Sequence, residues 1–328
     1  SAFEGMCPGG NPSESLINYH RMVSEGGVGM TTVAYTAVLN NGRSFAHQMW
    51  LRPEAIPMLK KLTDEVHKFG AKASIQLNHC GNMADSDVTG ERAIAPTGRF
   101  NIYGLVKPLK MSEKDIEDVI KAFGNGVHLA REAGFDAVEI HAGHGYLISQ
   151  FLSPYTNRRK DKWGGSLENR SRFLRCVMAE VKKAAGNDIA ILVKLNVRDG
   201  FRGGFDLEES IKVAKMLEED GADAIVLSGG FVSKKPLYVM RGKMPIREMA
   251  TGISNKVVKI FAKTFGDILL KEMPFEEAYF YKDALEIRKA VSIPLVLVGG
   301  ISSLAKTEEV LNNGIDFVAI ARPLVLDP

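Results

Sequence analysis

The 328-residue chain contains little cysteine and no long apolar run. Cys7, Cys80 and Cys176 are far apart and form no CxxC pair, which excludes a disulfide framework or a metal-cluster site within this stretch. No apolar segment approaches the ~18 residues that a membrane-spanning helix needs. The N-terminus shows no charged region followed by an apolar one, as a secretory signal would. We therefore expect a cytoplasmic protein with no membrane partner.

An excess of charge of either sign is also missing. The 42 Lys and Arg residues nearly balance the 39 Asp and Glu residues, which leaves a formal net charge of +3. Nucleic acid is therefore not expected as a partner. The composition, 45% hydrophobic and 25% charged, is that of a globular protein. The length suffices for one large α/β barrel or for two ordinary domains.

What the chain does contain is an internal repeat. The segments EAGFDAVEIH (132–141), EDGADAIVLS (219–228) and NNGIDFVAIA (312–321) are alike. Each closes a helical pattern with a glycine, which readily adopts the left-handed conformation that a helix C-terminus needs. An aspartate follows two residues later and precedes a short apolar strand. Apolar strands that alternate with amphipathic helices predict a parallel sheet covered by helices.

Counting the apolar runs gives eight strands in strict alternation with helices, which predicts a (β/α)8 TIM barrel of the α/β class. An open doubly wound sheet is the alternative, but no G-x-G-x-x-G motif follows the first strand. Ser112 with Asp115, and Asp206 with Glu209, are typical of helix starts. The strands are expected near residues 1–4, 29–35, 72–77, 137–141, 190–195, 224–228, 294–298 and 317–321.

We interpret residues 1–328 as a single barrel domain. The first strand begins at residue 1 and only RPLVLDP follows the eighth, so we expect an N-terminal segment and the eighth helix to lie outside this chain. The segment 231–278 after strand 6 is long for a connection and rich in methionine and aromatics. It is expected to form a substrate cap, an oligomer contact or helices outside the barrel. The basic NRRKDK (157–162) is interpreted as a solvated loop.

Function in such barrels is carried at the carboxyl ends of the strands and in the loops that follow. The loops after strands 7 and 8 are the usual phosphate site of this fold, and glycine amides followed by an arginine suit it. The alternative for the two glycines is a tight turn. The rule selects Gln76, Asn78, His141, His144, Tyr146, Lys194, Asn196, Ser228, Gly299, Gly300, Ala321 and Arg322.

The pair His141 and His144, with Tyr146 close behind, has three interpretations. A metal site would need a third ligand, for which Glu139 is the nearest carboxylate. A structural corner would have to satisfy two imidazoles and a phenol by packing. In the third interpretation the imidazoles stabilise negative charge on a substrate oxygen, and the tyrosine delivers a proton. Lys194, if buried, needs an anionic partner inside the barrel.

Four stretches together resemble the old yellow enzyme family: residues 138–174, IQLNHCG (75–81), VLVGGIS and DFVAIARPLVLDP. The long one reads VEIHAGHGYLISQFLSPYTNRRKDKWGGSLENRSRFL. The family comprises FMN-dependent NADH:flavin oxidoreductases and ene-reductases. It is related to the trimethylamine dehydrogenase and 2,4-dienoyl-CoA reductase barrels. The resemblance covers the whole chain.

This resemblance implies an FMN lying across the barrel mouth. Gln76 would bond the pyrimidine edge of the flavin, and Lys194 would stabilise the reduced form beside N1 and O2. His141 and His144 would bind the substrate carbonyl oxygen. Tyr146 would protonate the α carbon while flavin N5 passes hydride to the β carbon. The contacts to the FMN phosphate would come from Gly299, Gly300, Ala321 and Arg322.

The resemblance also marks places where this chain departs from its relatives. Many relatives carry a flavin-bonding threonine or cysteine on strand 1, where this chain has SAFEGM, with Ala2 and Phe3 near that place. Ala321 stands where relatives often have glycine. Tyr35, at the end of strand 2, is expected either to close one side of the substrate pocket or to pack at the barrel rim.

The expected activity is reduction of the activated C=C bond of an α,β-unsaturated carbonyl compound, with NADH or NADPH as the reductant. One alternative is the barrel domain of an iron–sulfur flavoprotein of the amine dehydrogenase or dienoyl-CoA reductase type. Its cluster would require cysteines beyond residue 328. Another is a flavin-free barrel that uses Lys194 as a Schiff-base lysine. A small-molecule substrate is expected in each case, and a homo-oligomer is a further expectation.

Overall fold

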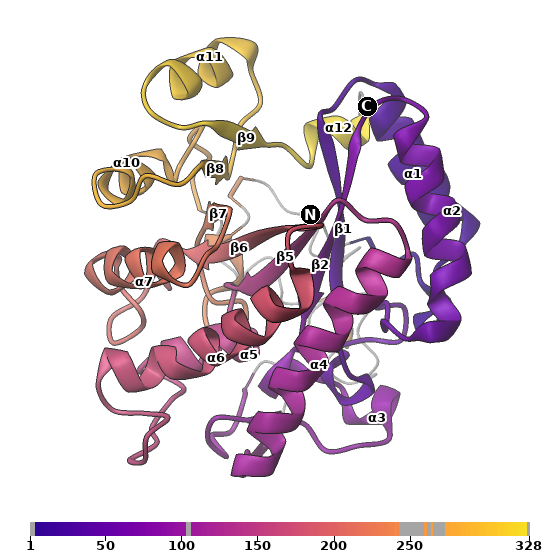
Figure 1. Cartoon of the computed structure of the whole chain (residues 1–328). Coiled ribbons are helices and arrows are strands. Elements are labelled where there is room, and N and C mark those ends of the chain that lie inside the picture. The colour runs from indigo at the N-terminus through magenta and orange to yellow at the C-terminus, as the bar shows by residue number, and fades with distance from the viewer. Residues whose placement is uncertain are drawn as a thin grey trace.

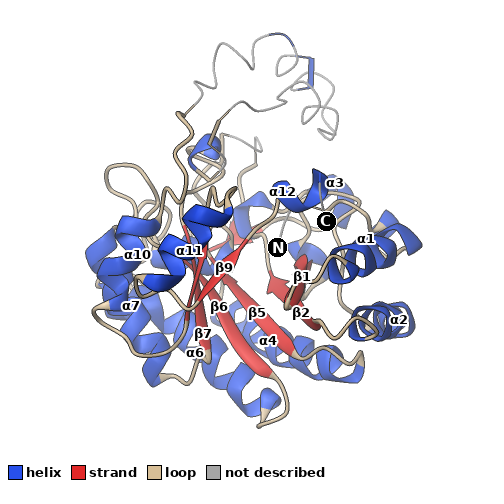
Figure 2. Ribbon diagram, turned by 90° about the horizontal axis from the view of Figure 1, so that it is seen from above, coloured by secondary structure: helices blue, strands red, loops and turns tan. Residues whose placement is uncertain are grey.

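The computed structural model describes residues 4–102, 106–239, 241–242, 259–260, 264 and 273–326. Seven parallel strands form one sheet, and neighbours in the sheet are also neighbours along the chain. Seen from above, the sheet curls and the helices lie outside it (Figure 2). The predicted barrel class is confirmed. In sheet order the strands are β1 (Met30–Ala37), β2 (Lys72–Asn78), β5 (Ala137–Ala142), β6 (Ala190–Asn196), β7 (Ala224–Ser228), β8 (Leu295–Val298) and β9 (Phe317–Ala319).

The longer helices return the chain from one strand to the next along the outside of the sheet (Figure 1). Their apolar faces and the strands bury one large core, and most strand residues are buried in it. The helices are α1 (Glu14–Glu25), α2 (Ile56–His67), α3 (Ser86–Thr89), α4 (Glu113–Glu132), α5 (Leu147–Leu152), α6 (Leu167–Ala185), α7 (Leu207–Glu219), α10 (Tyr281–Arg288), α11 (Leu304–Asn312) and α12 (Pro323–Leu326).

The repeated aspartates join the start of each strand to its predecessor in the sheet. The carboxylate of Asp223, before β7, accepts a hydrogen bond from the N–H of Ile191 in β6 at 2.7 Å, and the N–H of Asp223 donates to the Ile191 carbonyl at 2.8 Å. Asp136 makes the same two contacts with Ala73, and Asp316 makes them with Leu295. In each of the three repeats, the aspartate therefore links its strand to the neighbouring strand by two hydrogen bonds.

The other local predictions for the helices also hold. Gly134, Gly221 and Gly314 in the three repeats have φ values of 81°, 82° and 101°, in the left-handed region. Ser112 and Asp115 form a capping box at the start of α4, and the side chain of Asp206 accepts from the N–H of Glu209 at the start of α7. These glycines and caps fix where each helix begins and ends.

The ends of the chain and its long insertion differ in part from expectation. Of the strand predicted at residues 1–4, Glu4 lies in no strand and its Oε1 accepts from the N–H of Ala34 at 3.1 Å, while residues 1–3 lie outside the described residues. Most of the segment 231–278 also lies outside them, so its role as a cap stays a prediction. A short two-stranded sheet of β3 (Ile94–Ala95) and β4 (Leu109–Lys110) was not predicted.

The single-domain interpretation of residues 1–328 also stays a prediction. Within the described ranges, none of the helices combines the length and the apolar character that crossing a membrane requires.

Candidate active site

Polar side chains inside the barrel come from three adjacent strands, at two neighbouring positions of the register. The register pairs Gln76 of β2 with Glu139 of β5, and His141 of β5 with Lys194 of β6. All four are buried, with exposed fractions of 2 to 3%. The polar residues predicted on strand ends are therefore brought together. Glu139, which sequence reasoning considered only as a metal ligand, belongs to the same group.

Glu139 is the anionic partner that the buried lysine requires. The ammonium of Lys194 donates to Glu139 Oε1 at 2.8 Å, and the amide Nε2 of Gln76 donates to the same oxygen at 2.5 Å. Burial opposes ionisation of the carboxyl, but the charge of Lys194 and the two hydrogen bonds outweigh it and lower the pKa of Glu139. The carboxyl of Glu139 is therefore ionised at neutral pH.

The two histidines and the tyrosine form one cluster at the end of β5. The ring of His141 meets that of His144 edge to face at a centroid distance of 5.0 Å, and that of Tyr146 at 4.9 Å. Tyr35 from β1 stacks on Tyr146 at 5.4 Å. The predicted pocket residue Tyr35 therefore belongs to the cluster, in which two imidazole and two phenol rings are in contact.

His144 is held in an unusual backbone conformation. Its φ of 59° is rare for a residue other than glycine. The side-chain oxygen of Asn196 accepts from its N–H at 3.0 Å, and its Nε2 lies 2.7 Å from the hydroxyl of Ser228. Asn196 and Ser228 are the last residues of β6 and β7, so the two neighbouring strands fix the position of this imidazole.

Both histidines are neutral in this environment. Burial, reinforced by the neighbouring charge of Lys194, lowers the pKa of His144 to about 3 and that of His141 well below its usual range. Nδ1 of His141 accepts from the N–H of Gly143 at 3.3 Å, which puts the ring proton on Nε2. A neutral imidazole of this tautomer is a hydrogen-bond donor to an oxygen in front of it.

The glycine pair after β8 lies against aromatic rings. Gly299 and Gly300 have φ values of 133° and 77°, and a Cβ on either would come within 2.8 Å of an atom of Phe280 or Tyr279. Ala321 and Arg322 come just after β9, the strand that pairs with β8. Arg322 is exposed and donates to the Arg241 carbonyl at 3.1 Å.

Arg241 was not predicted from the sequence, which gave no reason to separate it from other charges of the long segment. Its guanidinium lies 4.5 Å over the ring of Tyr279, which packs against the two glycines. Arg241 is therefore a second arginine near the glycine pair, and it contacts the Tyr279 ring that packs against these glycines.

Two predicted residues lie outside the part of the chain that the structure describes: Ala2 and Phe3. As for the metal interpretation, the described residues contain no group of three His, Cys, Asp or Glu side chains that could hold an ion. The predicted residue Asn78 contacts a sulfur atom: its side-chain amide nitrogen donates to Sγ of Cys80 at 3.2 Å.

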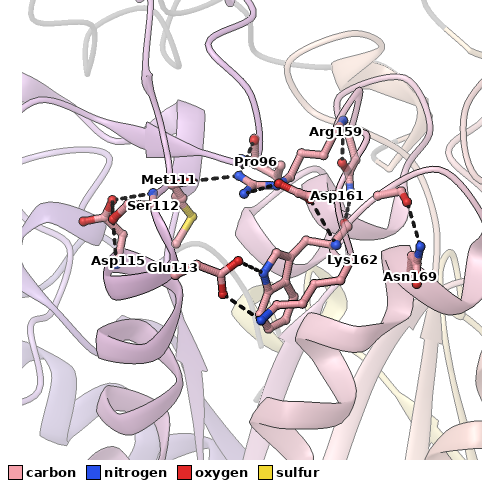
Figure 3. A network of polar contacts seen from close by, with 12 residues as sticks. Pro96, Met111, Ser112, Glu113, Asp115, Arg159, Asp161, Lys162 and Asn169 are labelled. Carbon is pink, nitrogen blue, oxygen red and sulfur yellow. Dashed lines mark hydrogen bonds and ion pairs between the residues drawn. The ribbon is translucent and has the colours of Figure 1, made fainter.

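The basic loop NRRKDK was interpreted as solvated, and this was wrong for its most important residues. Asn157 and Arg159 have exposed fractions of 3% and 6%. The guanidinium of Arg159 donates to the carbonyls of Pro96 and Met111 at 3.1 and 2.8 Å and pairs with Asp161 (Figure 3). The loop that follows α5 is therefore held by hydrogen bonds to the segment that precedes α4.

A curled parallel sheet, with polar residues converging at the carboxyl ends of its strands, defines a barrel enzyme. The chain belongs to the NADH:flavin oxidoreductase / NADH oxidase family, whose model matches residues 4–268. It is 39% identical over 331 residues to 4,4'-dithiodibutanoate disulfide reductase from Rhodococcus erythropolis. The alignment covers 100% of this chain and 81% of that relative.

Solved structures agree with this assignment. The fold is similar to that of a 2-naphthoyl-CoA reductase complex with 2-naphthoyl-CoA, with a TM-score of 0.85 and 26% identity over 100% of this chain. This chain spans 48% of the length of that one. It shares the fold of an old yellow enzyme homologue from Zymomonas mobilis, with a TM-score of 0.74, 24% identity and coverage of 98% of this chain and 82% of that one.

The predicted relationship to the old yellow enzyme family is thus confirmed. The protein is an NAD(P)H-dependent flavin oxidoreductase with FMN as its cofactor, and it acts on small molecules.

Proposed function

We propose that the protein reduces the activated C=C bond of an α,β-unsaturated carbonyl compound at the cluster of His141, His144 and Tyr146. The observation that carries this proposal is the position of the neutral His141 imidazole, which meets the ring of His144 at 5.0 Å and that of Tyr146 at 4.9 Å, both edge to face. Neutral imidazoles donate hydrogen bonds to an oxygen without protonating it fully, which suits a carbonyl that gains negative charge. A phenol next to them is placed to supply a proton to carbon.

The residues inside the barrel suit FMN. Gln76 and Lys194 offer buried hydrogen-bond donors for the polar edge of the ring system. The glycine pair offers backbone amides without side chains in the way, and Arg322 adds charge for the phosphate. When bound, the flavin takes hydride from NAD(P)H and supplies it to the substrate. In this proposal the protein positions both partners and moves the proton.

The roles of the residues follow from their surroundings. His141 donates from Nε2, because its Nδ1 is engaged by Gly143. His144 is oriented by Asn196 and Ser228. Tyr146 delivers the proton to the α carbon, and Tyr35, stacked on it, closes one side of the pocket.

The test is Tyr146→Phe, studied by rapid mixing of each half-reaction separately. We expect reduction of bound FMN by NAD(P)H to stay close to the wild-type rate. Reoxidation by an enone should slow by about the 10²–10⁴-fold typical of a general acid. Tyr35→Phe is the matched comparison, because it removes the hydroxyl of the stacked ring and should have a much smaller effect. An unchanged reoxidation rate in Tyr146→Phe would remove this residue from the proton-donor role.

A second candidate activity is reductive cleavage of a disulfide with anionic ends. The relative with 39% identity is a reductase of 4,4'-dithiodibutanoate, whose two ends are carboxylates. In this chain two exposed cations, Arg99 and Lys234, lie 4.2 and 5.4 Å over the ring of Tyr155. That ring contacts Phe231, which packs against Gly145 between the catalytic candidates.

Reoxidation experiments separate the two activities. FMN reduced anaerobically with NADH is mixed with an enone or with a dicarboxylate disulfide, and the return of the flavin absorbance is followed. Fast return with the enone supports the first proposal, and fast return with the disulfide alone supports the second. Failure of both, with fast electron transfer to a one-electron acceptor, would favour the iron–sulfur flavoprotein alternative.

A further inference from the structure

We propose that Glu139 sets the reduction potential of the bound flavin by holding Gln76 and Lys194 on a single carboxylate oxygen. Glu139 is a positioning residue in this proposal, because it acts through the two side chains that would face the flavin. The inference rests on the flavin placement proposed above, in which Gln76 and Lys194 lie at the polar edge of the ring.

The geometry gives Glu139 control over both neighbours. Its Oε1 accepts from Gln76 Nε2 at 2.5 Å and from Lys194 Nζ at 2.8 Å. The other end of the amide, Oε1 of Gln76, accepts from the N–H of Tyr35 at 3.0 Å. These two contacts assign the orientation of the Gln76 amide, since the nitrogen must point to the carboxylate and the oxygen to the backbone N–H.

Burial makes the charge of Glu139 effective. The carboxylate and the ammonium have exposed side-chain fractions of 4% and 3%, so solvent screens them little. A carboxylate next to Lys194 offsets part of the positive potential that the lysine projects into the barrel. Reduction of a flavin adds electron density to its polar edge. Lys194 therefore favours reduction and Glu139 moderates it, which keeps the cofactor reducing enough to pass hydride on.

The experiment measures the midpoint potential of FMN in the holoenzyme by reduction against a dye of known potential. Glu139→Gln removes the charge but keeps a side chain of the same length. We expect at least a tenfold increase in the equilibrium constant for reduction, which is about 30 mV more positive for a two-electron couple. Glu209→Gln is the matched control, because Glu209 pairs with the buried Arg170 outside the strands of the barrel. The control should leave the potential at the wild-type value.

Glu139→Asp provides a second reading that does not depend on the stability of the glutamine variant. It keeps the charge but withdraws the carboxylate by one methylene, so it can no longer approach both donors closely. We expect a smaller shift in the same positive direction. If Glu139→Gln does not retain FMN, the potential of Glu139→Asp decides alone. A wild-type potential in every Glu139 variant that binds FMN would overturn the proposal.

Lys194→Met separates this proposal from the flavin placement on which it rests. If the placement is right, loss of the lysine makes the potential more negative. A shift in Lys194→Met without any shift in the Glu139 variants would overturn the role of Glu139 and leave the placement intact. If neither position affects the potential, the placement itself is wrong.

Discussion

Replacing His79 with Asn should flatten the pH dependence of the free energy of unfolding on the acid side of neutrality. His79 follows β2 and is 1% exposed. Its Nδ1 accepts from the N–H of Gly81 at 3.1 Å, and its Nε2 lies 3.1 Å from the Asn41 side-chain oxygen. Burial lowers its pKa from 6.5 to about 3. The folded protein therefore keeps this ring neutral at pH values where the unfolded chain binds a proton.

The sign and the size follow from that difference. A depressed pKa in the folded state contributes stability that is present above pH 6.5 and is lost as the pH falls towards 3. The pH of 5 lies about 1.5 units below the pKa of histidine in the unfolded chain, and each unit stabilises the protonated unfolded state by about 1.36 kcal/mol. The wild-type protein should therefore lose about 2 kcal/mol between pH 7 and pH 5 on account of His79, and His79→Asn should not.

The assay is urea unfolding of both proteins at pH 7, 6 and 5 with FMN at a fixed saturating concentration. The difference in unfolding free energy between wild type and variant is compared across pH, so that the contributions of His141 and His144 cancel. His128→Asn, on the exposed side of α4, controls for the loss of an imidazole as such. Parallel stability curves for wild type and His79→Asn would refute the reasoning.

Two further substitutions test the rim and the opposite end of the barrel. Gly145→Ala places a Cβ 2.6 Å from the ring of Phe231 at a φ of 82°, so we expect a loss of about 1–3 kcal/mol in urea unfolding and slower reoxidation by substrate. A fully active and stable variant would contradict the close packing. Asp223→Ala leaves the N–H of Ile191 without its carboxylate acceptor and should cost about 1–3 kcal/mol in the same assay. Its turnover should equal that of wild type, because the change lies far from the strand ends that carry chemistry.

The sheet could be predicted from the sequence to a large extent. The apolar run expected at 224–228 is β7, and the run expected at 29–35 is β1, displaced by one or two residues. Such runs are reliable because parallel strands buried on both faces need continuous apolar sequence. The polar residues at the ends of these runs could be selected for the same reason, since the fold concentrates function there.

The parts that failed depend on contacts between distant segments. Alternation placed Glu139 on the same face as His141, but only the register between β2, β5 and β6 shows that it holds Gln76 and Lys194. Arg159 lies in a run of charges that is typical of a solvated loop, yet it is buried because carbonyls from two other segments accept its hydrogens. The two-residue strands β3 and β4 are too short to leave a pattern.

The aspartates of the three repeats separate what holds the barrel together from what it does. Asp136, Asp223 and Asp316 fasten neighbouring strands where those strands begin, whereas the polar cluster lies where they end. A mutation or an inserted segment at the carboxyl ends of the strands therefore leaves the hydrogen bonds between the strand starts in place. The architecture is modular in this sense. New substrate preferences can be tried out in the rim loops, by natural variation or by an engineer, without re-specifying the fold beneath them.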